Sequence, residues 1–352
     1  MNVLLTCAGR RNFLVDYFRD ALDGRGRVFA SDMSEAAPAL AEADRAFVVP
    51  PMNDRGYVDA LLAICRSHDV RLVISVNDME LPALSENAAR FRAAGTSAVV
   101  AAPATLNLCQ DKWAAFKQLR AWRIPTPETC LSLTAARSAL SAGSLKFPLI
   151  VKPRWGTSSI GVERVGDIRE LTIAYHWIKL QLERTILAEM CRAQPDKSLL
   201  IQQCLEGEEY GLDIVNDLDG RHVATLARRK LAMRAGNTDR AVTVADTRLD
   251  CLGKLLGERL SHPGSVDCDV IEDRDGFQVL DINPRLGGGY PFSHLAGANL
   301  PAALIAWANG DDVDPGWLQT RPGVTSAKYD NVMVVAKTLD IANERHAEAA
   351  TT

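Results

Sequence analysis

A short segment near the C-terminus constrains this chain more than any other. An apolar run, residues 279–283, carries Asp281 and Asn283 two positions apart. On a β-strand, side chains at positions i and i+2 point to the same face. Arg285 follows this run, and behind it stand Gly287, Gly288 and Gly289. Two oxygen donors beside an arginine suit a Mg²⁺–phosphate complex, because Mg²⁺ takes oxygen ligands and shares them with substrate phosphates.

The stretch before this segment is predicted to pair with it as a β-hairpin. Residues 266–272 are strand-like, and a three-residue Arg-Asp-Gly loop with its glycine in the left-handed conformation would join the strands. In that register Asp269 lies opposite Asp281, and Asp267 lies opposite Asn283. Three carboxylates and an amide on one face would repel one another unless a cation were present. Two alternatives stay open: a surface hairpin with solvated acids, and Asp267 in place of Asp269 as a metal ligand.

Composition excludes several classes of protein. The chain has 352 residues, enough for two or three modules with a full core. Its net charge is −4 with acids and bases interspersed, which leaves no basic surface for a nucleic-acid partner. No apolar stretch approaches the roughly 18 residues of a membrane span, and the N-terminus lacks a signal-peptide pattern. The 8 cysteines are scattered without a Cys-x-x-Cys pair, which favours reduced core residues in a cytoplasmic protein.

The N-terminal part of the chain alternates between strand-like and helical patterns. An amphipathic helix is expected at 12–22, and short apolar strands are expected at 2–7, 27–30, 46–49, 72–76 and 98–101. This order is typical of a parallel, doubly wound α/β domain, which we place at residues 1–104. A Rossmann dehydrogenase is the rival interpretation. However, residues 7–12 do not read Gly-x-Gly-x-x-Gly, and they carry two arginines where a pyrophosphate would meet the helix.

Polar side chains follow the ends of the predicted strands, where ligands bind in such sheets. Arg10 and Arg11 follow the first strand, while Asn77, Asp78 and Glu80 follow a later one. Two arginines suit a substrate carboxylate through forked hydrogen bonds, and Asp78 or Glu80 suits a cationic amine. These are the two ends of an amino acid. The alternative is that Arg11 and Asp78 cap helices or pair with each other.

A second region is predicted to begin with one helix at residues 105–122, which bears Asp111-Lys112. A strand at 147–153 contains Lys152, and it leads into a loop bounded by Gly156 and Gly161 with three hydroxyl side chains, Thr157, Ser158 and Ser159. Hydroxyl and backbone N–H donors in such a loop could wrap phosphate oxygens, with a lysine as counter-charge. A plain hairpin turn is the alternative.

With the strand–turn–strand pattern of residues 199–213, the order of these features resembles the ATP-grasp superfamily. The most specific parts of the likeness are Asp111-Lys112, Val151-Lys152-Pro153 with its glycine-flanked loop, and residues 281–285. The chain is most similar to single-unit proteins that resemble the carbamoyl-phosphate synthase large subunit. The likeness implies an α/β fold with an N-terminal Rossmann-like pre-ATP-grasp domain, followed by a two-subdomain α+β ATP-grasp domain. The implied ranges are 1–104, then 105–352, with the small lid subdomain within 105–205 and the metal-binding subdomain at 206–352.

The resemblance also implies roles for individual residues. Two lysines would contact the ATP phosphates, a glycine-flanked loop would close over them, a short linker would read adenine, and an acid would bind the ribose. This ATP-binding set comprises Lys112, Lys152, Gly156, Thr157, Ser158, Ser159, Gly161, Gln202, Gln203, Cys204, Leu205 and Glu209. Mg²⁺, with Mn²⁺ as an alternative, would be held by Asp269, Asp281 and Asn283. Arg285 and Lys152 would act in catalysis by stabilising the transferred phosphoryl group.

Two further segments are candidates for the substrate site. Residues 228–240 are dense in cations and glycine, typical either of a solvated loop or of a lid that brings charge, such as Arg234, to phosphates or a substrate carboxylate. Gly288 and Gly289 would form a floor under the acceptor substrate, because glycine lets the backbone approach a ligand and take left-handed conformations. A simple strand-to-helix turn would need glycine as well.

No serine or cysteine nucleophile beside a histidine and an acid stands out, so a substrate should supply the phosphoryl acceptor. The resemblance implies a ligase that joins a small-molecule carboxylate to an amine through an acyl phosphate, on amino-acid-like substrates, and releases ADP and phosphate. Such phosphoryl transfer is catalysed mainly by positioning and charge neutralisation. The alternatives are a carbamoyl-phosphate-synthase-like kinase for bicarbonate or carbamate, which needs two fused units, and a non-catalytic ATP-binding regulator. We expect no nucleic-acid or membrane partner, and a homodimer is left open.

Overall fold

The structure, a computed structural model, describes residues 1–156 and 159–335. The chain forms two compact units. The first comprises Met1–Val99 and Pro301–Asp312, together with the segment that begins at Tyr329, and the second comprises Val100–Leu300 and Val313–Lys328. The predicted α/β class is confirmed by a parallel sheet in the first unit and two antiparallel sheets in the second. Within the described ranges, no helix combines the length and apolarity needed to cross a bilayer.

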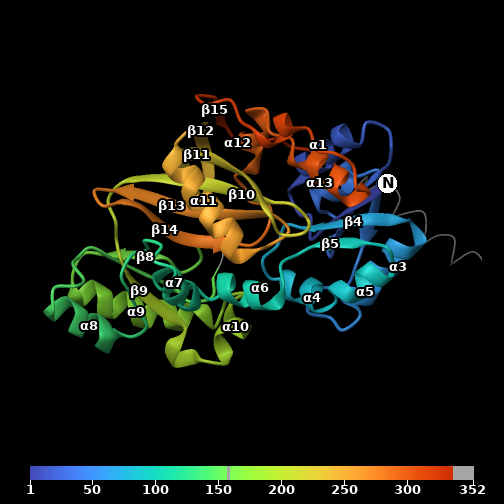
Figure 1. Cartoon of the computed structure of the whole chain (residues 1–352). Helices are drawn as coiled ribbons and strands as arrows, with labels where there is room; N and C mark the ends of the chain where they lie inside the picture. Colours follow the sequence, from blue (N-terminus) through green and yellow to red (C-terminus); the bar gives the residue numbers. More distant parts are fainter. Residues whose placement is uncertain (157–158, 336–352) are drawn as a thin grey trace, which may run out of the picture. The chain divides into compact units, whose positions relative to one another are not determined.

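The first unit is built on a five-stranded parallel sheet with the order β3-β2-β1-β4-β5, coloured blue to cyan in Figure 1. Its central strands are apolar and buried, as expected for a parallel sheet covered by its connecting helices. The strands are β1 (Asn2–Thr6), β2 (Val28–Asp32), β3 (Arg45–Val48), β4 (Val70–Ser75) and β5 (Ser97–Val99). The helices between them are α1 (Asn12–Leu22), α2 (Pro38–Glu42), α3 (Tyr57–Ser67), α4 (Leu81–Glu86) and α5 (Ala88–Ala93). The alternation predicted for this part of the sequence is therefore confirmed.

The second unit contains a small antiparallel sheet with the order β6-β9-β7-β8, drawn in green in Figure 1. Its strands are β6 (Thr129–Cys130), β7 (Leu149–Pro153), β8 (Glu163–Val165) and β9 (Leu199–Gln203). The helices α8 (Leu133–Ser141), α9 (Ile168–Leu182) and α10 (Ala188–Arg192), with the short 3₁₀ turn η1 (Pro195–Lys197), accompany this sheet. Apolar side chains from the strands and these helices form one buried cluster, which makes this part a subdomain with its own core.

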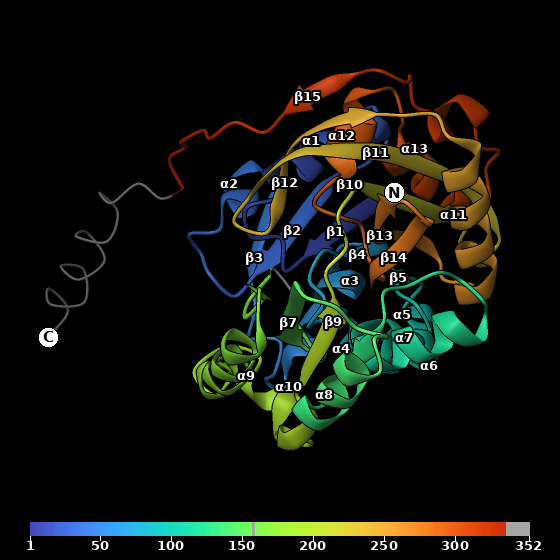
Figure 2. The same cartoon turned by 90° about the vertical axis from the view of Figure 1, so that its left-hand side faces the viewer.

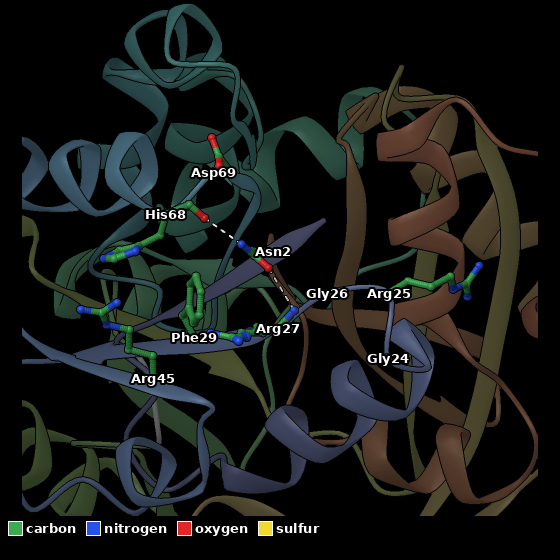
Figure 3. Close-up of a pocket in the computed structure, with 9 residues that line it drawn as sticks. All are labelled: Asn2, Gly24, Arg25, Gly26, Arg27, Phe29, Arg45, His68 and Asp69. Carbon is green, nitrogen blue, oxygen red and sulfur yellow. Dashed lines mark hydrogen bonds between the residues drawn. The ribbon is translucent and has the colours of Figure 1, made fainter.

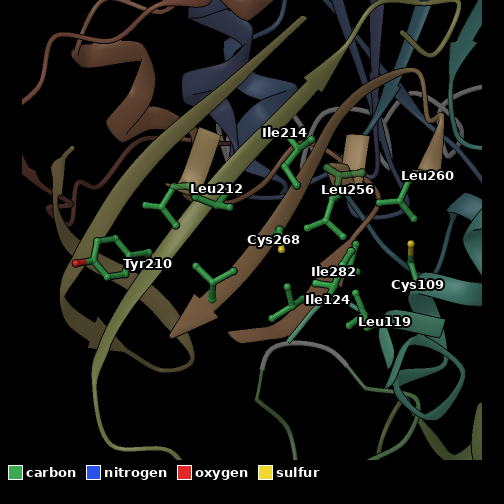
Figure 4. Close-up of a cluster of buried hydrophobic side chains, with 14 of the residues drawn as sticks. Cys109, Leu119, Ile124, Tyr210, Leu212, Ile214, Leu256, Leu260, Cys268 and Ile282 are labelled. Carbon is green, nitrogen blue, oxygen red and sulfur yellow. The ribbon is translucent and has the colours of Figure 1, made fainter. Parts of the chain in front are cut away.

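A larger antiparallel sheet has the order β14-β13-β10-β11-β12-β15, and Figure 2 shows β12 and β15 side by side at its edge. The strands are β10 (Glu208–Asn216), β11 (His222–Arg234), β12 (Asn237–Thr243), β13 (Gly264–Asp273), β14 (Gly276–Asn283) and β15 (Thr325–Ala327). The helix α11 (Thr247–Leu260) packs on β10 and β11. Leu212, Ile214, Leu256 and Cys268 meet in the core beneath this helix (Figure 4). The remaining elements are α12 (Tyr290–Leu295), α13 (Leu300–Asn309) and η2 (Pro315–Leu318).

The single helix predicted at 105–122 is wrong, because the structure has two helices there. They are α6 (Pro103–Gln110) and α7 (Lys112–Ala121), and the break between them is at Asp111. Asp111 has an extended backbone (φ −96°, ψ 96°), and its side chain accepts hydrogen bonds from the N–H groups of Trp113 and Ala114. This is an N-cap, which begins a new helix at Lys112.

The cationic stretch 228–240 is not a solvated loop, and its predicted role as a lid stays a prediction. It lies in the paired strands β11 and β12, which are joined by Ala235 and Gly236. Both turn residues have positive φ (48° and 74°), as a tight hairpin of this kind requires. The alternation of a strand then sends successive cations to opposite faces of the sheet. The charges of this stretch are therefore fixed on the large sheet.

Candidate active site

The hairpin of β13 and β14 places the predicted acids on one face of the large sheet. Asp269 pairs with Asp281, and Asp267 pairs with Asn283, so the register predicted from the sequence is confirmed. Residues directly opposite each other on neighbouring strands have Cβ atoms about 4.5–5.5 Å apart. Three carboxylates and one amide are therefore close neighbours on this surface, which we call the acid face: Asp267, Asp269, Asp281 and Asn283.

The loop of this hairpin differs from the predicted three-residue form. Asp273 pairs with Gly276, so only Arg274 and Asp275 lie between the paired ends. The residue that the shorter loop saves is taken up by an irregularity at Leu280, where the pairing shifts between Asp269 and Val270. A bulge inserts one residue into one strand and restores the register beyond it. The acids consequently face each other although the loop was predicted wrongly.

Lysine side chains hold two of these carboxylates. Lys112 Nζ lies 2.5 and 2.6 Å from the two carboxylate oxygens of Asp281. Burial alone would raise the pKa of Asp281, but Lys112 and Lys152 outweigh it and lower that pKa. Lys230 Nζ lies 2.7 Å from Asp269 Oδ1. The acid face is therefore charge-compensated by ammonium groups.

Hydrogen bonds of Asp111, Lys112 and Arg154 fix the start of α7. Arg154 donates two hydrogen bonds to the carboxylate of Asp111, at 2.7 and 2.6 Å. The N–H of Lys112 donates to the carbonyl of Arg154 (3.1 Å). Asp111 caps α7 at the same time, as described above. A forked arginine–carboxylate pair fixes geometry as well as charge. The sequence pair Asp111-Lys112 thus works as a helix start that aims Lys112 at the acid face.

Lys152, from β7, is the second lysine at this place. It is partly buried, and its Nζ donates to Oε1 of Gln202 (2.8 Å). Gln202 in turn donates from Nε2 to the hydroxyl of Thr129 (2.9 Å), which fixes the orientation of its amide. Burial and the nearby charge of Lys112 lower the pKa of Lys152 to about 8. A lysine destabilised in this way gains most from an anion placed beside it.

A narrow cavity lies among these groups. It is lined by side chains of α7, β7, β9 and β14, including both lysines, Gln202 and Asp281. Its apolar wall consists of Ala115, Phe116, Leu119, Val279, Leu280 and Ile282. The cavity measures only about 10 Å³, and the two lysine side chains are directed to Asp281 and Gln202. A ligand would therefore have to draw the lysines away from these partners.

Arg228, on β11, is a buried cation that the sequence patterns did not indicate. Its side chain is 1% exposed, and it pairs with Asp213 (2.6 Å) and Asp267 (2.9 Å). Ser293 also donates to Asp213, at 2.6 Å. Gly211 on β10 lies opposite Arg228, and a Cβ there would stand 3.0 Å from the guanidinium. The missing side chain leaves Arg228 room to cross β10 and reach Asp267 on β13.

The glycine run after β14 packs against this pair rather than turning left-handed. A Cβ on Gly287 would lie 2.4 Å from Cγ of Asp267, and one on Gly289 would lie 2.1 Å from Nη2 of Arg228. None of the three has a positive φ. A Cβ on Gly288 would have only Asn237 Oδ1 nearby, at 3.6 Å. Close approach to two side chains therefore explains Gly287 and Gly289, and Gly288 is the open position.

Arg285 lies beside the same acids. It is partly buried, with Nη1 3.9 Å from Oδ2 of Asp267 and 3.3 Å from the carbonyl of Leu286. Glu209, on β10, accepts from Lys230 Nζ at 2.6 Å. Lys230 thereby links the predicted ribose-binding acid to the predicted metal ligand Asp269. Arg234, at the far end of β11, is exposed and pairs with Asp239 at 3.0 Å.

The segment predicted to read adenine connects the two antiparallel sheets. β9 belongs to the small sheet and β10 to the large one, so residues 204–207 run between them. The side chain of Gln203 is used by the backbone of its own subdomain. It accepts from the N–H of Lys146 (2.9 Å) and donates to three carbonyls, those of Lys146, Pro148 and Cys204. Gln203 therefore secures the start of the linker.

The glycine-flanked loop is described only in part, since Thr157 and Ser158 lie outside the described residues. Gly161 has φ +69°, and a Cβ there would stand 3.1 Å from Ile178 and 3.3 Å from Pro153. Ser159 also has a positive φ, of 55°, and is exposed. A Cβ on Gly156 would lie 3.1 Å from Pro153. Both glycines are thus required by the backbone and its packing, whatever the loop binds.

The five candidates in the first unit divide into two groups. Glu80 is fully buried, and its carboxylate accepts from the hydroxyls of Thr6 (2.9 Å), Tyr57 (2.6 Å) and Ser75 (2.6 Å), which ties strand ends together. Arg10 is exposed, and Arg11, Asn77 and Asp78 are partly buried. Arg11 occupies the N-cap position of α1 but makes no capping hydrogen bond with its side chain. Their predicted contact with a substrate stays a prediction.

A separate hollow of about 460 Å³ opens in the first unit at the start of its strands. Figure 3 shows Phe29 flanked by the side chains of Arg27, Arg45 and His68, while Arg25 extends away from them. Asn2 bridges the carbonyl of His68 and the N–H of Arg27. Parallel sheets bind ligands beyond the opposite, carboxyl ends of their strands.

The acid face suits Mg²⁺ by its donors. It presents carboxylate and amide oxygens only, and ammonium groups already sit against two of the carboxylates. Among the described residues, no three His, Cys, Asp or Glu side chains are grouped as a ready-made metal cage. Mg²⁺ does not need one, because it is usually bound by one or two carboxylates together with substrate phosphates. Asp269 and Asp281, with Asn283 beside them, are the residues that would hold it.

Two family models match separate parts of the chain. Residues 3–99 match the PylC-like N-terminal domain, and residues 195–331 match an ATP-grasp family from a biosynthetic pathway with the Ter operon. A D-alanine–D-alanine ligase of Ralstonia nicotianae is 27% identical over 189 residues, which is 53% of this chain and 52% of the ligase. A second one, from Stutzerimonas stutzeri, is 24% identical over 50% of this chain and 55% of its own. The chain thus matches about half the length of these curated relatives.

Solved structures share the fold over most of the chain. The biotin carboxylase domain of the Hydrogenobacter thermophilus 2-oxoglutarate carboxylase, solved with MgADP, ADP and bicarbonate, has a TM-score of 0.69 at 14% identity and covers 89% of this chain and 70% of its own. An L-amino acid ligase from Bacillus licheniformis has a TM-score of 0.66 at 18% identity, over 92% and 79%. These likenesses confirm the predicted order of a Rossmann-like domain and a two-subdomain ATP-grasp domain. Residues 195–331 of this chain thus match an ATP-grasp family, and the solved structures extend the likeness of fold to most of the chain.

Proposed function

We propose that this protein is an ATP- and Mg²⁺-dependent carboxylate–amine ligase that forms an amide through an acyl phosphate. One observation carries the proposal: Lys112, Lys152 and Asp281 come from separate elements of the second unit and line one cavity, and Asp269 lies opposite Asp281 on the neighbouring strand. Oxygen donors for a metal and ammonium donors for phosphate are the groups that phosphoryl transfer needs. The ligases among the similar proteins support the same reaction class.

The residues of the chain would act mainly through charge and position. On nucleotide binding, Lys112 and Lys152 exchange Asp281 and Gln202 for phosphate oxygens, which restores a full counter-charge to Lys152. The released carboxylate of Asp281, with Asp269 and Asn283, would hold Mg²⁺, and the ion would neutralise charge on the phosphate oxygens. Arg285 lies beside these acids, where it can stabilise charge on the transferred phosphoryl group.

The chemistry of the substrates then needs no protein nucleophile. A carboxylate oxygen of the first substrate attacks the terminal phosphorus, and the bond to the ADP oxygen breaks. The amine nitrogen of the second substrate attacks the carbonyl carbon, the carbon–oxygen bond to phosphate breaks, and the nitrogen loses a proton. The products are an amide, ADP and phosphate. We propose amino-acid-like substrates, in keeping with the arginines and acids after the strands of the first unit.

Substrate-dependent ADP release tests this function. The full chain is incubated with ATP and Mg²⁺ and with pairs drawn from amino acids and small carboxylates, and products are weighed by mass spectrometry. We expect ADP and an amide in equal amounts for some pair. ADP release that requires bicarbonate, without an amide, would replace the ligase with a bicarbonate-phosphorylating activity. Nucleotide binding without turnover on any substrate would favour an ATP-binding regulator.

A further inference from the structure

Lys230 is a buried lysine of the large sheet that forms ion pairs with two carboxylates on two different strands. It projects from β11, its side chain is 5% exposed, and its Nζ lies 2.6 Å from Glu209 Oε1 and 2.7 Å from Asp269 Oδ1. Glu209 is on the neighbouring strand β10, whereas Asp269 is one strand further, on β13. The residue of β10 that pairs with Asp269 is Gly211, and the guanidinium of Arg228 fills the space beside it. Lys230 therefore spans β10 to reach a carboxylate that we assign to Mg²⁺.

Each of the two carboxylates that we assign to the metal forms an ion pair with a lysine. Asp269 is held by Lys230, and Asp281 is held by Lys112. The surrounding charges are also matched in number, since five acids face five cationic side chains. The acids are Glu209, Asp213, Asp267, Asp269 and Asp281, and the bases are Lys112, Lys152, Arg228, Lys230 and Arg285. The cluster is balanced before any ligand enters.

This balance affects a free metal ion and a metal–nucleotide complex in opposite ways. A divalent cation alone would add positive charge to a balanced, partly buried cluster and would have to displace an ammonium group from its carboxylate. Repulsion between the ion and an ammonium group a few ångströms away is stronger at a partly buried site than in bulk water. A nucleotide polyphosphate with its metal is a net anion, and it offers new partners to the displaced lysines. The charges of the cluster thus favour the metal–nucleotide complex over the free metal ion.

We propose that Lys230 is a positioning residue that holds Asp269 against Glu209 and bars free Mg²⁺, so that the metal enters this site with the nucleotide. This inference rests on the proposed function, because it takes the acid face to be the metal–nucleotide site. It assigns to Lys230 a role in binding order that a merely structural lysine would not have. Metal and nucleotide should then bind with strong positive coupling, and the coupling should depend on Lys230.

Binding of Mn²⁺ alone, followed by electron paramagnetic resonance, gives a readout that does not depend on turnover. The full chain is titrated with Mn²⁺ without nucleotide, as wild type and as Lys230→Met, which keeps most of the aliphatic stem and removes the charge. We expect Lys230→Met to bind Mn²⁺ at least about tenfold more tightly than the wild type, because a full positive charge has left the site. Lys230→Arg, which keeps the charge, should resemble the wild type.

Lys254→Met is the matched control, because Lys254 is an exposed lysine of α11 whose contact with Glu258 spans 3.9 Å. It should leave Mn²⁺ binding unchanged. Unchanged or weaker Mn²⁺ binding by folded Lys230→Met would overturn the inference. Should that variant not fold, the wild type decides: equal Mn²⁺ affinity with and without saturating ADP would refute the coupling. Failure of the wild type to bind ADP at all, with Mn²⁺ or Mg²⁺ present, would instead refute the proposed function.

Discussion

Lys152 is the residue whose surroundings are most plainly prepared for an anion. Its ammonium group is partly buried, has a glutamine oxygen as its hydrogen-bond partner, and lies near the positive charge of Lys112. These conditions lower its pKa to about 8. A phosphate group would supply the negative charge that Gln202 cannot. Removal of the Lys152 ammonium group should therefore act on nucleotide affinity more than on the fold.

Nucleotide affinity should fall as pH rises through about 8, where the free protein begins to lose the proton of Lys152. Below that pH the lysine is charged, and above it a proton must be taken up on binding. Lys152→Ala should weaken ADP binding by about 1.5–3 kcal/mol, the worth of a charged hydrogen bond, and should flatten the pH dependence. Calorimetric titration from pH 7 to 9.5 measures both effects. Unchanged affinity in the variant would remove Lys152 from the phosphate site.

Gly289→Ala should destabilise the protein by roughly 1–3 kcal/mol, because its Cβ would collide with the guanidinium of Arg228 and overpack a buried ion pair. Gly288→Ala is the matched control one residue away. Its Cβ would stand 3.6 Å from Asn237 Oδ1, an ordinary contact. Urea unfolding of the two variants provides the comparison. Equal stabilities would mean that the glycine run is not needed for packing against Arg228.

At the scale of elements, the hairpin and the helix start show what the sequence reveals and what it hides. Alternating apolar and polar residues put the acids of each strand on one face, because that spacing is local. The register of Asp269 and Asp281 came out as predicted because the shorter loop and the bulge at Leu280 offset each other. The bulge at Leu280 could not be predicted, because it arises from how β14 pairs with β13 and no residue type at that position signals it. The break at Asp111 was missed, although aspartate before a helical run is an N-cap signal that the sequence carried.

The buried cations of β11 are a clearer example of contacts that could not be predicted from the sequence. Arg228 and Lys230 are two residues apart, and strand periodicity would have put them on one face. Their partners on β10 and β13 become neighbours only when three strands assemble. Gly211 leaves space for the Arg228 side chain to pass over β10, but a glycine in a strand does not by itself indicate such a contact. Such long-range arrangements need the fold before they can be recognised.

Asp111→Ala should reduce both stability and nucleotide affinity. The cap of α7 contributes about 1 kcal/mol, and Lys112 would lose the fixed start from which it reaches Asp281. Asp167→Ala is the control, because Asp167 caps α9 in the same way, through the N–H groups of Arg169 and Glu170. Thermal unfolding and ADP titration separate the effects. We expect both variants to lose stability but only Asp111→Ala to bind ADP more weakly.

The whole molecule brings together a parallel sheet and an ATP-grasp domain, each with its own core. Local patterns predicted the alternation of the first unit and the β13–β14 hairpin, whereas the two-subdomain α+β domain was implied by the family likeness. They did not predict that Pro301–Asp312 belongs with the N-terminal residues, because nothing in that segment encodes a partner so distant in sequence. The boundaries placed at residues 104 and 205 stay predictions. So does the substrate role of Arg10, Arg11, Asn77 and Asp78.

Steady-state kinetics tests that role once substrates are known. Arg11→Ala and Asp78→Ala should raise KM for the carboxylate or amine substrate and leave KM for ATP unchanged. Glu80→Gln offers a contrast, because Glu80 is buried under three hydroxyl donors and should affect stability first. A loss of stability with unaltered KM in the Arg11 and Asp78 variants would show that these residues serve only the packing of their unit.

The most direct test of the metal–nucleotide site compares the wild type with Asp281→Asn in the assay of ADP release and amide mass. The substitution removes one negative charge and keeps the shape of the side chain. The proposed ligase predicts that Asp281→Asn keeps its fold and most of its ADP affinity but loses turnover in Mg²⁺. Asn283→Ala should behave in the same way. Near-normal amide formation by folded Asp281→Asn would contradict the assignment of this strand to the metal and, with it, the proposed mechanism.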